Sequence, residues 1–280
     1  MGAIIFHPGI GKTATSAIQN LGVKLPTDDP NSVCFSPYGL LGNVHNALAN
    51  NHPQFDYAVY EEEIAHLINF AKSRKADTVV SSEFLIRCSA EHIKNMLNLI
   101  KKSGVEVRVL FVIRNYSDYI ISSYLQAVKV RWGMRPNESL VDYAKREISN
   151  VRLLMLIDQW ARVVGDEHIF ILDYDKGRDT IVKDFFNFTG FYDLDGLEVD
   201  KVVNPSIPIS AANILLEFDK VSDDAEKRLN MINLLSRTTF KSNYDEAVRN
   251  DVQAVIKGAY QHDYSRLNDR YQILSKEEEQ

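Results

Sequence analysis

The stretch Ala3-Ile4-Ile5-Phe6-His7-Pro8-Gly9-Ile10-Gly11-Lys12-Thr13-Ala14-Thr15-Ser16 decides the fold class of this chain. It opens with a short apolar run of the kind that forms a strand buried in a parallel sheet. Two glycines then allow the backbone to turn tightly and to approach a ligand closely, and a helical pattern begins at Thr15. A strand, a glycine-lysine turn and a helix N-terminus together form the design of a phosphate cradle.

Further apolar runs alternate with helical patterns along the next 150 residues. The runs Thr78–Ser82, Val107–Ile113 and His168–Leu172 predict three more buried strands. The helical segments are Thr15–Leu21, Glu61–Lys75, Ala90–Ser103, Asp118–Lys129 and Arg152–Val164. Ser89 is placed to cap the third of these helices, and Gly104 to end it. Strands that alternate with helices predict a mostly parallel sheet with helices on both faces.

The last third of the chain has a different character. Ile181–Thr189 is a helical pattern closed by Gly190, and helix then alternates with loop without a clear strand. We therefore expect an α/β, P-loop-like three-layer fold with a central mostly parallel sheet flanked by helices, plus a helical C-terminal region. The predicted organisation is one domain over residues 1–280, with an α/β core at 1–175, a mainly helical extension at 176–274 and a frayed tail at 275–280.

Composition limits the kinds of partner. A formal net charge of −6 over 280 residues gives no basic field for nucleic acid or an anionic membrane, so an anionic ligand must be held by local groups. No apolar run reaches the ~20 residues that cross a bilayer, which predicts no stable membrane insertion. The N-terminus lacks a signal-peptide pattern, and Cys34 and Cys88 are expected as buried free thiols. We expect a cytoplasmic protein.

A second informative segment is Val109-Leu110-Phe111-Val112-Ile113-Arg114-Asn115. Arg114 follows a buried strand at the carboxyl edge of the sheet, where open α/β sheets bind ligands. Ser122 lies eight residues later, on the following helix. A guanidinium and a hydroxyl placed in this way can converge on one phosphate group.

The two segments together resemble those of the 3′-phosphoadenosine-5′-phosphosulfate (PAPS)-dependent sulfotransferases, in particular bacterial carbohydrate and polysaccharide sulfotransferases. In that family a Lys-Thr-Gly-Thr-Thr/Ser-like loop holds the 5′-phosphosulfate, and a strand ends in Arg-Asn-Pro or Arg-Asp-Pro with Ser eight positions after the Arg. This chain has Lys12-Thr13-Ala14-Thr15-Ser16 and Arg114-Asn115-Tyr116, with Ser122. It departs from the pattern at Ala14, which is tolerable where its φ is negative, and at Tyr116.

A looser similarity extends over nearly the whole chain. Its segments are Ser81-Ser82-Glu83, the loop Tyr38–Ala49, Asn204-Pro205-Ser206 and Asp263–Tyr271. The resemblance implies transfer of a sulfuryl group from PAPS to a hydroxyl of a polysaccharide, a glycolipid or another hydroxylated small molecule, with adenosine 3′,5′-bisphosphate as the product and no metal. It assigns the 5′-phosphosulfate to Gly11, Lys12, Thr13, Ala14, Thr15 and Ser16, and the 3′-phosphate to Arg114 and Ser122. Lys12 is suited to neutralise charge on the leaving oxygen.

The acceptor hydroxyl needs a general base, and two residues qualify. His45 lies in the loop expected to cover the acceptor, and its ordinary pKa suits base catalysis. Glu83 follows a buried strand, where partial burial raises a carboxyl pKa. The alternatives are an ordinary loop histidine and a structural carboxylate bonded to amides or to Lys12. We favour His45 as the base with Glu83 orienting it or the acceptor, and expect His7 to be a core histidine.

Two rival functions remain open. A P-loop nucleoside or sugar kinase shares the sheet and the cradle, but its G-x-x-x-x-G-K-[ST] motif needs glycine where this chain has Phe6. Glu83 is the only tempting Mg²⁺ ligand for such a kinase. A catalytically inert nucleotide-binding protein is the other rival. The residues Gln126, Lys129, Arg131 and Trp132 suit either an acceptor cleft or an exposed basic helix end.

Overall fold

The structure, a computed structural model, describes residues 1–131, 133, 135, 137–148, 152–192, 207–237 and 243–274. For residues 258–262 and 272 it describes the backbone only. Three sequence predictions fall outside the described residues: Trp132, Asn204-Pro205-Ser206 and the tail 275–280.

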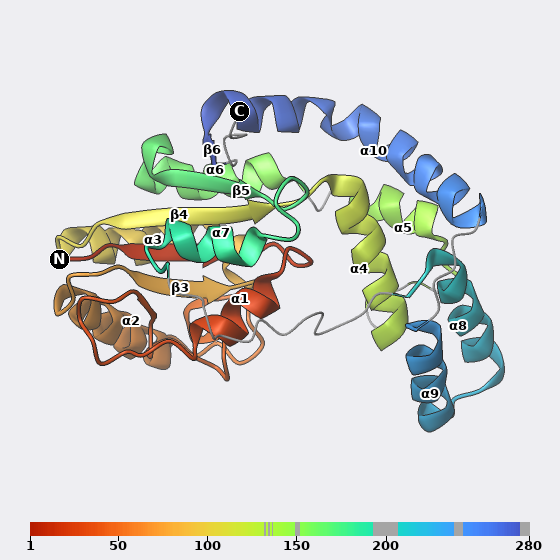
Figure 1. Cartoon of the computed structure of the whole chain (residues 1–280), viewed down its shortest axis with the longest axis horizontal. Helices are drawn as coiled ribbons and strands as arrows, with labels where there is room; N and C mark the ends of the chain where they lie inside the picture. The colour runs from red at the N-terminus through yellow and green to blue at the C-terminus, as the bar shows by residue number, and fades with distance from the viewer. Residues whose placement is uncertain are drawn as a thin grey trace. The chain divides into compact units, whose positions relative to one another are not determined.

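A six-stranded parallel sheet forms the centre of the fold (Figure 1). Its strands are β1 (Ile4–Pro8), β2 (Cys34–Phe35), β3 (Thr78–Ser82), β4 (Val107–Ile113), β5 (Ile169–Asp173) and β6 (Gln272–Leu274). They lie in the order β2-β3-β1-β4-β5-β6, and each neighbouring pair is parallel. The carboxyl ends of β1, β3, β4 and β5 therefore share one edge of the sheet.

Helices cover both faces of the sheet because successive strand residues point to opposite sides. These helices are α1 (Thr15–Gly22), α2 (Tyr57–Lys72), α3 (Ala90–Lys102), α6 (Leu153–Val164) and α7 (Ile181–Phe188). Ile5 belongs to a buried cluster that holds Ile18 of α1 and Phe185 of α7. The next residue, Phe6, instead contacts Trp160 of α6, with ring centroids 5.6 Å apart. The short 3₁₀ helices η1 (Asn46–Leu48), η2 (Leu85–Arg87) and η3 (Asp166–His168) lie in the connections.

The predicted fold class is confirmed, and so are the bounds of β3 and β4. The Ser89 hydroxyl accepts from the His92 N–H and caps α3, and Gly104 has a φ of 82°, as a helix-ending glycine requires. The expectation of no strand in the last third is wrong, because β6 pairs with β5. The loop-rich segment after residue 26 also contains the short strand β2.

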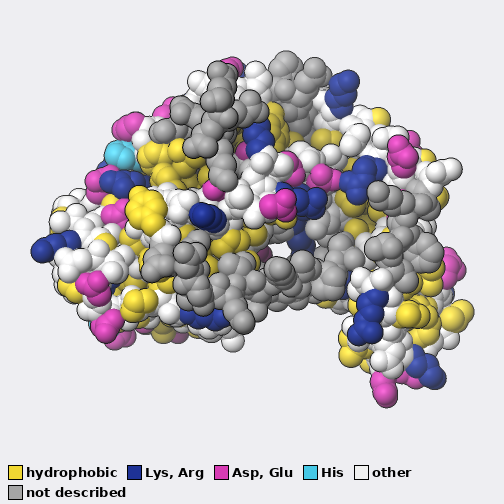
Figure 2. All heavy atoms as spheres, in the orientation of Figure 1, with side chains coloured by type: hydrophobic (Ala, Val, Ile, Leu, Met, Phe, Trp, Pro, Cys, Tyr) yellow, Lys and Arg dark blue, Asp and Glu magenta, His cyan; other side chains and the backbone are white. Residues whose placement is uncertain are grey.

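The chain divides into two compact units. The sheet unit comprises Met1–Arg114, Leu153–Lys201 and Ser265–Gln280, and the helical unit comprises Asn115–Arg152 and Val202–Tyr264. A single domain over the whole chain stays a prediction. Among the described residues, no helix combines the length and apolar character needed to span a bilayer. Basic and acidic side chains are interspersed on the face shown in Figure 2.

The helical unit contains α4 (Tyr116–Val130), α5 (Leu140–Glu147), α8 (Ile209–Val221), α9 (Ala225–Leu235) and most of α10 (Asn243–Arg270). Arg228 of α9 is buried and ties three of these helices together. It donates to the carbonyls of Val128 and Lys129 at the end of α4, both at 2.6 Å, and to Asp219 of α8 at 2.8 Å. A guanidinium at a helix C-terminus satisfies carbonyls that have no partner within the helix.

Candidate anion-binding site at the sheet edge

The turn between β1 and α1 has the backbone of an anion nest. Lys12 and Ala14 have φ of 72° and 61°, and Thr13 between them has a negative φ. Residues of alternating hand direct successive N–H groups toward one concavity, as in phosphate-binding loops. The condition of a negative φ for Ala14 is not met. Ala14 adopts the left-handed backbone conformation, which costs a residue with a side chain about 1–2 kcal/mol relative to the right-handed conformation.

Buried hydroxyls brace this turn from inside. Thr13 donates to the Ile10 carbonyl at 2.5 Å, and Thr15 is 3.4 Å from the same oxygen. A Cβ at Gly9 would lie 2.6 Å from the Thr15 methyl group, so this glycine is required by the close approach. Because both threonines are buried, the backbone amides, Lys12 and the exposed Ser16 are the groups of the predicted set that remain open to an anion.

Arg114, the residue after β4, lies against this turn. Its Nη1 donates to the Lys12 carbonyl at 3.3 Å, and its Nε is 3.7 Å from Asp175 Oδ1. The guanidinium carbon is also 5.1 Å from the centroid of the Tyr174 ring, and the side chain is 11% exposed. The structure thus brings together the cradle and Arg114, which are 102 residues apart in sequence. Ser122 is half-buried on α4 in the helical unit, and its role as a phosphate ligand stays a prediction.

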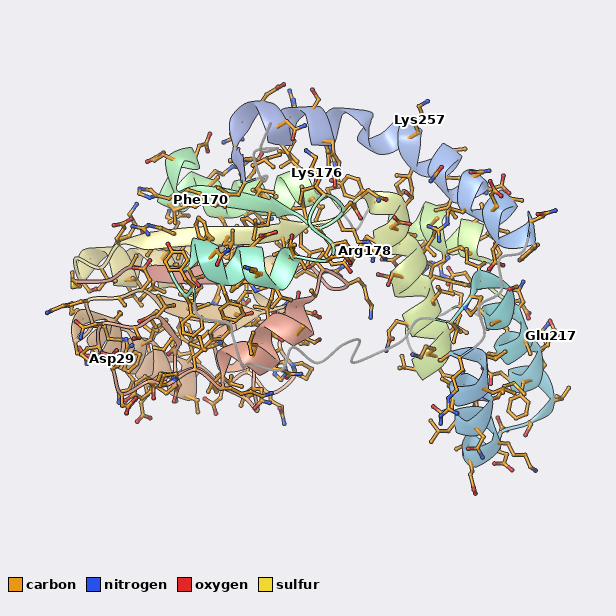
Figure 3. All side chains as sticks on the ribbon, in the orientation of Figure 1. Asp29, Phe170, Lys176, Arg178, Glu217 and Lys257 are labelled. Atoms are coloured by element: carbon orange, nitrogen blue, oxygen red, sulfur yellow. The ribbon has the colours of Figure 1, made fainter. Side chains whose placement is uncertain are left out.

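Two residues of this edge were missed by the sequence analysis. Tyr174 and Asp175 follow β5, and Ile113 of β4 is in register with Asp173. The sequence did carry a signal, because any polar residue after a predicted parallel strand reaches the same edge. The connection that continues from β5 also carries Lys176 and Arg178, and the Arg178 guanidinium is 5.9 Å from the centroid of the Tyr174 ring (Figure 3).

Glu83, directly after β3, lies along the other side of the turn. A Cβ at Gly11 would be 3.6 Å from Glu83 Oε2, and one at Gly9 would be 3.3 Å from Glu83 Cγ. Desolvation beside the turn raises the pKa of Glu83, although the residue as a whole is exposed, and the nearby Lys12 charge opposes the rise. Desolvation lowers the pKa of Lys12, against the effect of Glu83. Both groups therefore titrate closer to neutral pH than usual.

His45 does not have the surroundings of a general base, which corrects the preference stated from sequence. It is fully buried, and its Nδ1 is 3.0 Å from the amide nitrogen and 3.1 Å from the carbonyl oxygen of Ser81, while Nε2 is 3.0 Å from the Ser36 carbonyl oxygen. The tautomer protonated on Nε2 satisfies both the Ser81 amide and the Ser36 carbonyl. Burial lowers the pKa of His45 to about 4. These contacts make His45 a structural link between its loop and β3.

His7 is a core histidine, as expected. Its Nδ1 is 2.9 Å from the Ser81 hydroxyl, which also accepts from Gln19 of α1 at 3.1 Å. Its ring packs on Phe185 at 4.9 Å between centroids. Burial lowers the pKa of His7 to about 3, so the ring is neutral. Among the described residues no group of three or more His, Cys, Asp or Glu side chains is placed to hold a metal.

Comparison with solved structures finds a likeness in fold. No family model and no curated protein matches the chain. A crystal structure of a sulfotransferase from Alicyclobacillus acidocaldarius is similar with a TM-score of 0.45 and 12% sequence identity. The similarity covers 86% of this chain and 98% of that one.

Proposed function

We propose that this protein is a sulfotransferase that moves a sulfuryl group from PAPS to a hydroxyl of a polysaccharide, a glycolipid or another carbohydrate. The observation that carries the proposal is the hydrogen bond from Arg114 to the Lys12 carbonyl. This hydrogen bond places Arg114 next to the turn that holds Lys12, and these two segments are the ones that resemble the sulfotransferase motifs. PAPS carries anionic groups at both ends of its ribose, and two separate anion-binding elements at one sheet edge suit such a donor.

Each donor group has residues suited to it. The N–H groups of the turn and the start of α1, with Lys12 and Ser16, would hold the 5′-phosphosulfate. Arg114, with Ser122, would hold the 3′-phosphate and so distinguish PAPS from nucleotides that lack it. Arg114 is pre-positioned for this role because Asp175 and Tyr174 hold its guanidinium at low exposure.

The reaction breaks the bond from sulfur to the bridging oxygen of the donor and forms a bond from sulfur to the acceptor oxygen. Lys12 would neutralise the charge that develops on the leaving phosphate, and the leaving group is adenosine 3′,5′-bisphosphate. The acceptor proton goes to Glu83, which we place as the base instead of His45. Glu83 lies beside Lys12 on the cradle, and its raised pKa brings its proton affinity closer to working pH.

Calorimetric titration with three nucleotides tests the donor assignment. We expect PAPS to bind more tightly than adenosine 5′-phosphosulfate, which lacks the 3′-phosphate, and more tightly than ATP with Mg²⁺. A preference for ATP with Mg²⁺ would support the kinase alternative and contradict the proposal. Binding of PAPS without transfer to any sugar acceptor would support the inert nucleotide-binding alternative.

The pH dependence of transfer tests the base. A base acts when deprotonated, so activity should rise with pH through the raised pKa of Glu83 and fall again through the lowered pKa of Lys12. Glu83→Gln should remove the acidic limb together with most of the activity. His45→Gln should change stability and leave the acidic limb in place, and loss of that limb in this variant would return the role to His45.

A further inference from the structure

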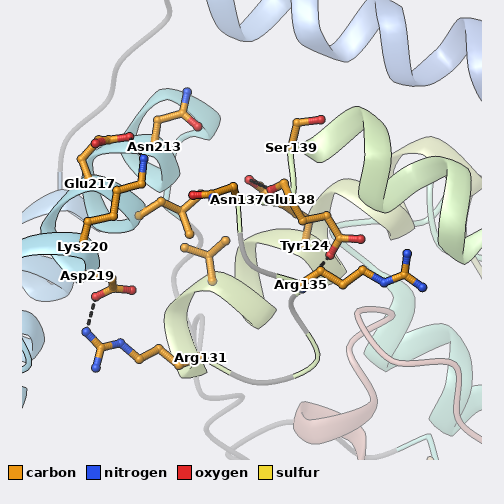
Figure 4. A pocket seen from close by; sticks show the side chains of 12 residues that line it. Tyr124, Arg131, Arg135, Asn137, Glu138, Ser139, Asn213, Glu217, Asp219 and Lys220 are labelled. Atoms are coloured by element: carbon orange, nitrogen blue, oxygen red, sulfur yellow. Dashed lines mark hydrogen bonds and ion pairs between the residues drawn. The ribbon is translucent and has the colours of Figure 1, made fainter.

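A pocket of about 560 Å³ lies within the helical unit, between the end of α4 with Arg135 and 137–139 on one side and α8 on the other (Figure 4). Its volume falls in the usual range for small-molecule sites. Of the residues considered from sequence for an acceptor cleft, Arg131 lines it and Gln126 and Lys129 do not. Nothing assigned to the sheet edge accounts for this pocket.

The wall formed by α8 has its charges paired. Asp219 accepts from Arg131 Nη2 at 2.5 Å and from the buried Arg228 at 2.8 Å. Lys220 donates to Glu217 at 2.6 Å, one turn along the same helix. Arg131, which follows α4, and Lys220 of α8 both line the pocket, and each is paired with a carboxylate of α8 that also lines it.

The opposite wall is held in the same manner. Glu138 is buried, and both of its carboxylate oxygens accept from Arg146, at 2.7 Å and 2.9 Å. Its Oε2 also accepts from the Arg135 amide at 3.1 Å. These hydrogen bonds hold the pKa of Glu138 below its usual value. The carboxylate therefore stays charged and fixed, and this wall keeps its shape without a ligand.

The pocket is also lined by apolar and by neutral hydrogen-bonding side chains. Val128 and Leu216 supply aliphatic surface, and Asn137 and Asn213 supply amides. Asn213 donates one N–H to Tyr244 at 2.8 Å, which orients its amide. Asn137 lines the pocket, and no hydrogen bond joins its amide to another described residue.

This combination favours one chemical class. Five of the six charged side chains that line the pocket, Arg131, Lys220, Glu138, Glu217 and Asp219, are already held in ion pairs, so most of the lining charge is committed before a ligand binds. A purely apolar ligand would make no hydrogen bonds to the Asn137 and Asn213 amides. Hydroxyl groups both donate and accept, and can bond to amides, carboxylates and guanidinium groups alike, while the C–H face of a sugar ring packs on aliphatic side chains.

We propose that this pocket binds an uncharged saccharide through the Asn137 and Asn213 amides and the aliphatic surface of Val128 and Leu216. The proposal extends the function proposed above by giving the helical unit a sugar-binding site of its own. Binding at this site needs no donor nucleotide, so it stands or fails separately from sulfuryl transfer.

The test uses the full chain and the neutral trisaccharides maltotriose, cellotriose and chitotriose. Saturation-transfer NMR without nucleotide should show binding of at least one of them. Leu216→Trp fills the pocket, and we expect it to weaken that binding roughly tenfold or more. Ile214→Trp is the matched control, because Ile214 lies on the same helix, is 48% exposed and is not among the lining residues.

Asn213→Ala is a second variant, which leaves the aliphatic surface of Val128 and Leu216 intact. It should weaken binding by about fivefold because the amide is lost. Each variant should keep its circular dichroism and its affinity for adenosine 3′,5′-bisphosphate, which separates loss of the sugar site from loss of fold or donor site. The proposal is overturned if none of the three sugars binds, if Leu216→Trp binds as well as Ile214→Trp, or if glucose 6-phosphate binds where the neutral sugars do not.

Discussion

The turn after β1 and the pocket beside α8 differ in the groups that they offer to a ligand. The turn uses backbone N–H groups in left-handed conformations, with Lys12 and Arg114 close to it. In the pocket, Arg131, Lys220, Glu138, Glu217 and Asp219 are each committed to ion pairs. An anion is best met by backbone N–H groups directed at one point, and a neutral ligand by side-chain charges that are already neutralised. The backbone donors of the turn therefore separate the two sites more clearly than ion pairing does, since Arg114 is itself paired with Asp175.

We expect the largest effect from removing the positive charge of Lys12, which tests whether the turn acts on an anionic donor. Lys12→Met keeps the aliphatic stem and the backbone conformation, and we expect sulfuryl transfer to fall about 10³-fold because charge on the leaving phosphate is no longer neutralised. Steady-state kinetics with PAPS would measure it. Lys24→Met, an exposed lysine shortly after α1, serves as the control. Near-normal turnover in Lys12→Met would refute its catalytic assignment.

Arg114 tests the second cation of the same site. Arg114→Ala should weaken binding of adenosine 3′,5′-bisphosphate by about 2–4 kcal/mol, since a charged phosphate contact is lost. Binding of adenosine 5′-phosphate should change much less. Arg108→Ala, at the other end of β4 and paired with Asp77, is the matched control. An equal loss for both nucleotides in Arg114→Ala would speak against recognition of the 3′-phosphate.

Arg228 tests whether pairing in the helical unit is structural. Arg228→Met leaves the Val128 and Lys129 carbonyls without this donor, while Asp219 keeps Arg131. We expect the free energy of unfolding to drop by about 2 kcal/mol, measured by urea denaturation. Arg237→Met, at an exposed position after α9, should change it by less than about 0.5 kcal/mol. Equal stability of the two variants would show that the network contributes no net stability.

Acid titration probes the buried histidines behind the turn. In the folded protein the pKa of His45 is about 4 and that of His7 about 3, against ordinary values near 6.5. The unfolded chain therefore binds protons first as pH falls below 6.5. Each histidine should cost about 1.4 kcal/mol of stability per pH unit from there down to its folded pKa.

Urea denaturation at several pH values between 4 and 6.5 measures this slope. His45→Gln should reduce the slope of stability against pH by about 1.4 kcal/mol per pH unit, the contribution of one histidine. If His45→Gln and the unchanged protein share one slope, His45 is not buried as a neutral ring.

The smallest expected effect concerns the strained methyl group of the turn. Ala14→Gly relieves the left-handed strain but gains entropy in the unfolded chain, and a net stabilisation of about 0.5–1 kcal/mol should remain. Ala65→Gly, in the exposed middle of α2, should instead destabilise by about 1 kcal/mol. The same substitution should thus have opposite signs at the two positions, and equal signs would contradict the φ of Ala14.

The sequence predicted best the elements whose structure depends on local residues alone. The apolar runs of β3 and β4 could be bounded to the residue because they are buried on both faces. Gln272–Leu274 forms a strand only because β5 offers an edge, and three residues after a long helix carry no periodicity of their own. The surroundings of His45 could not be predicted from sequence either, because its partners Ser36 and Ser81 come from separate segments of the chain. The left-handed φ of Ala14 opposes local preference, so no propensity could predict it.

The bracing of the nest by Thr13 has a consequence for how fast a ligand is captured. Because the Ile10 carbonyl already holds that hydroxyl, the turn has its final shape before any anion arrives. Stopped-flow mixing with adenosine 3′,5′-bisphosphate should then give one exponential phase whose rate increases linearly with ligand concentration. A plateau in that rate would indicate that the loop has to rearrange first.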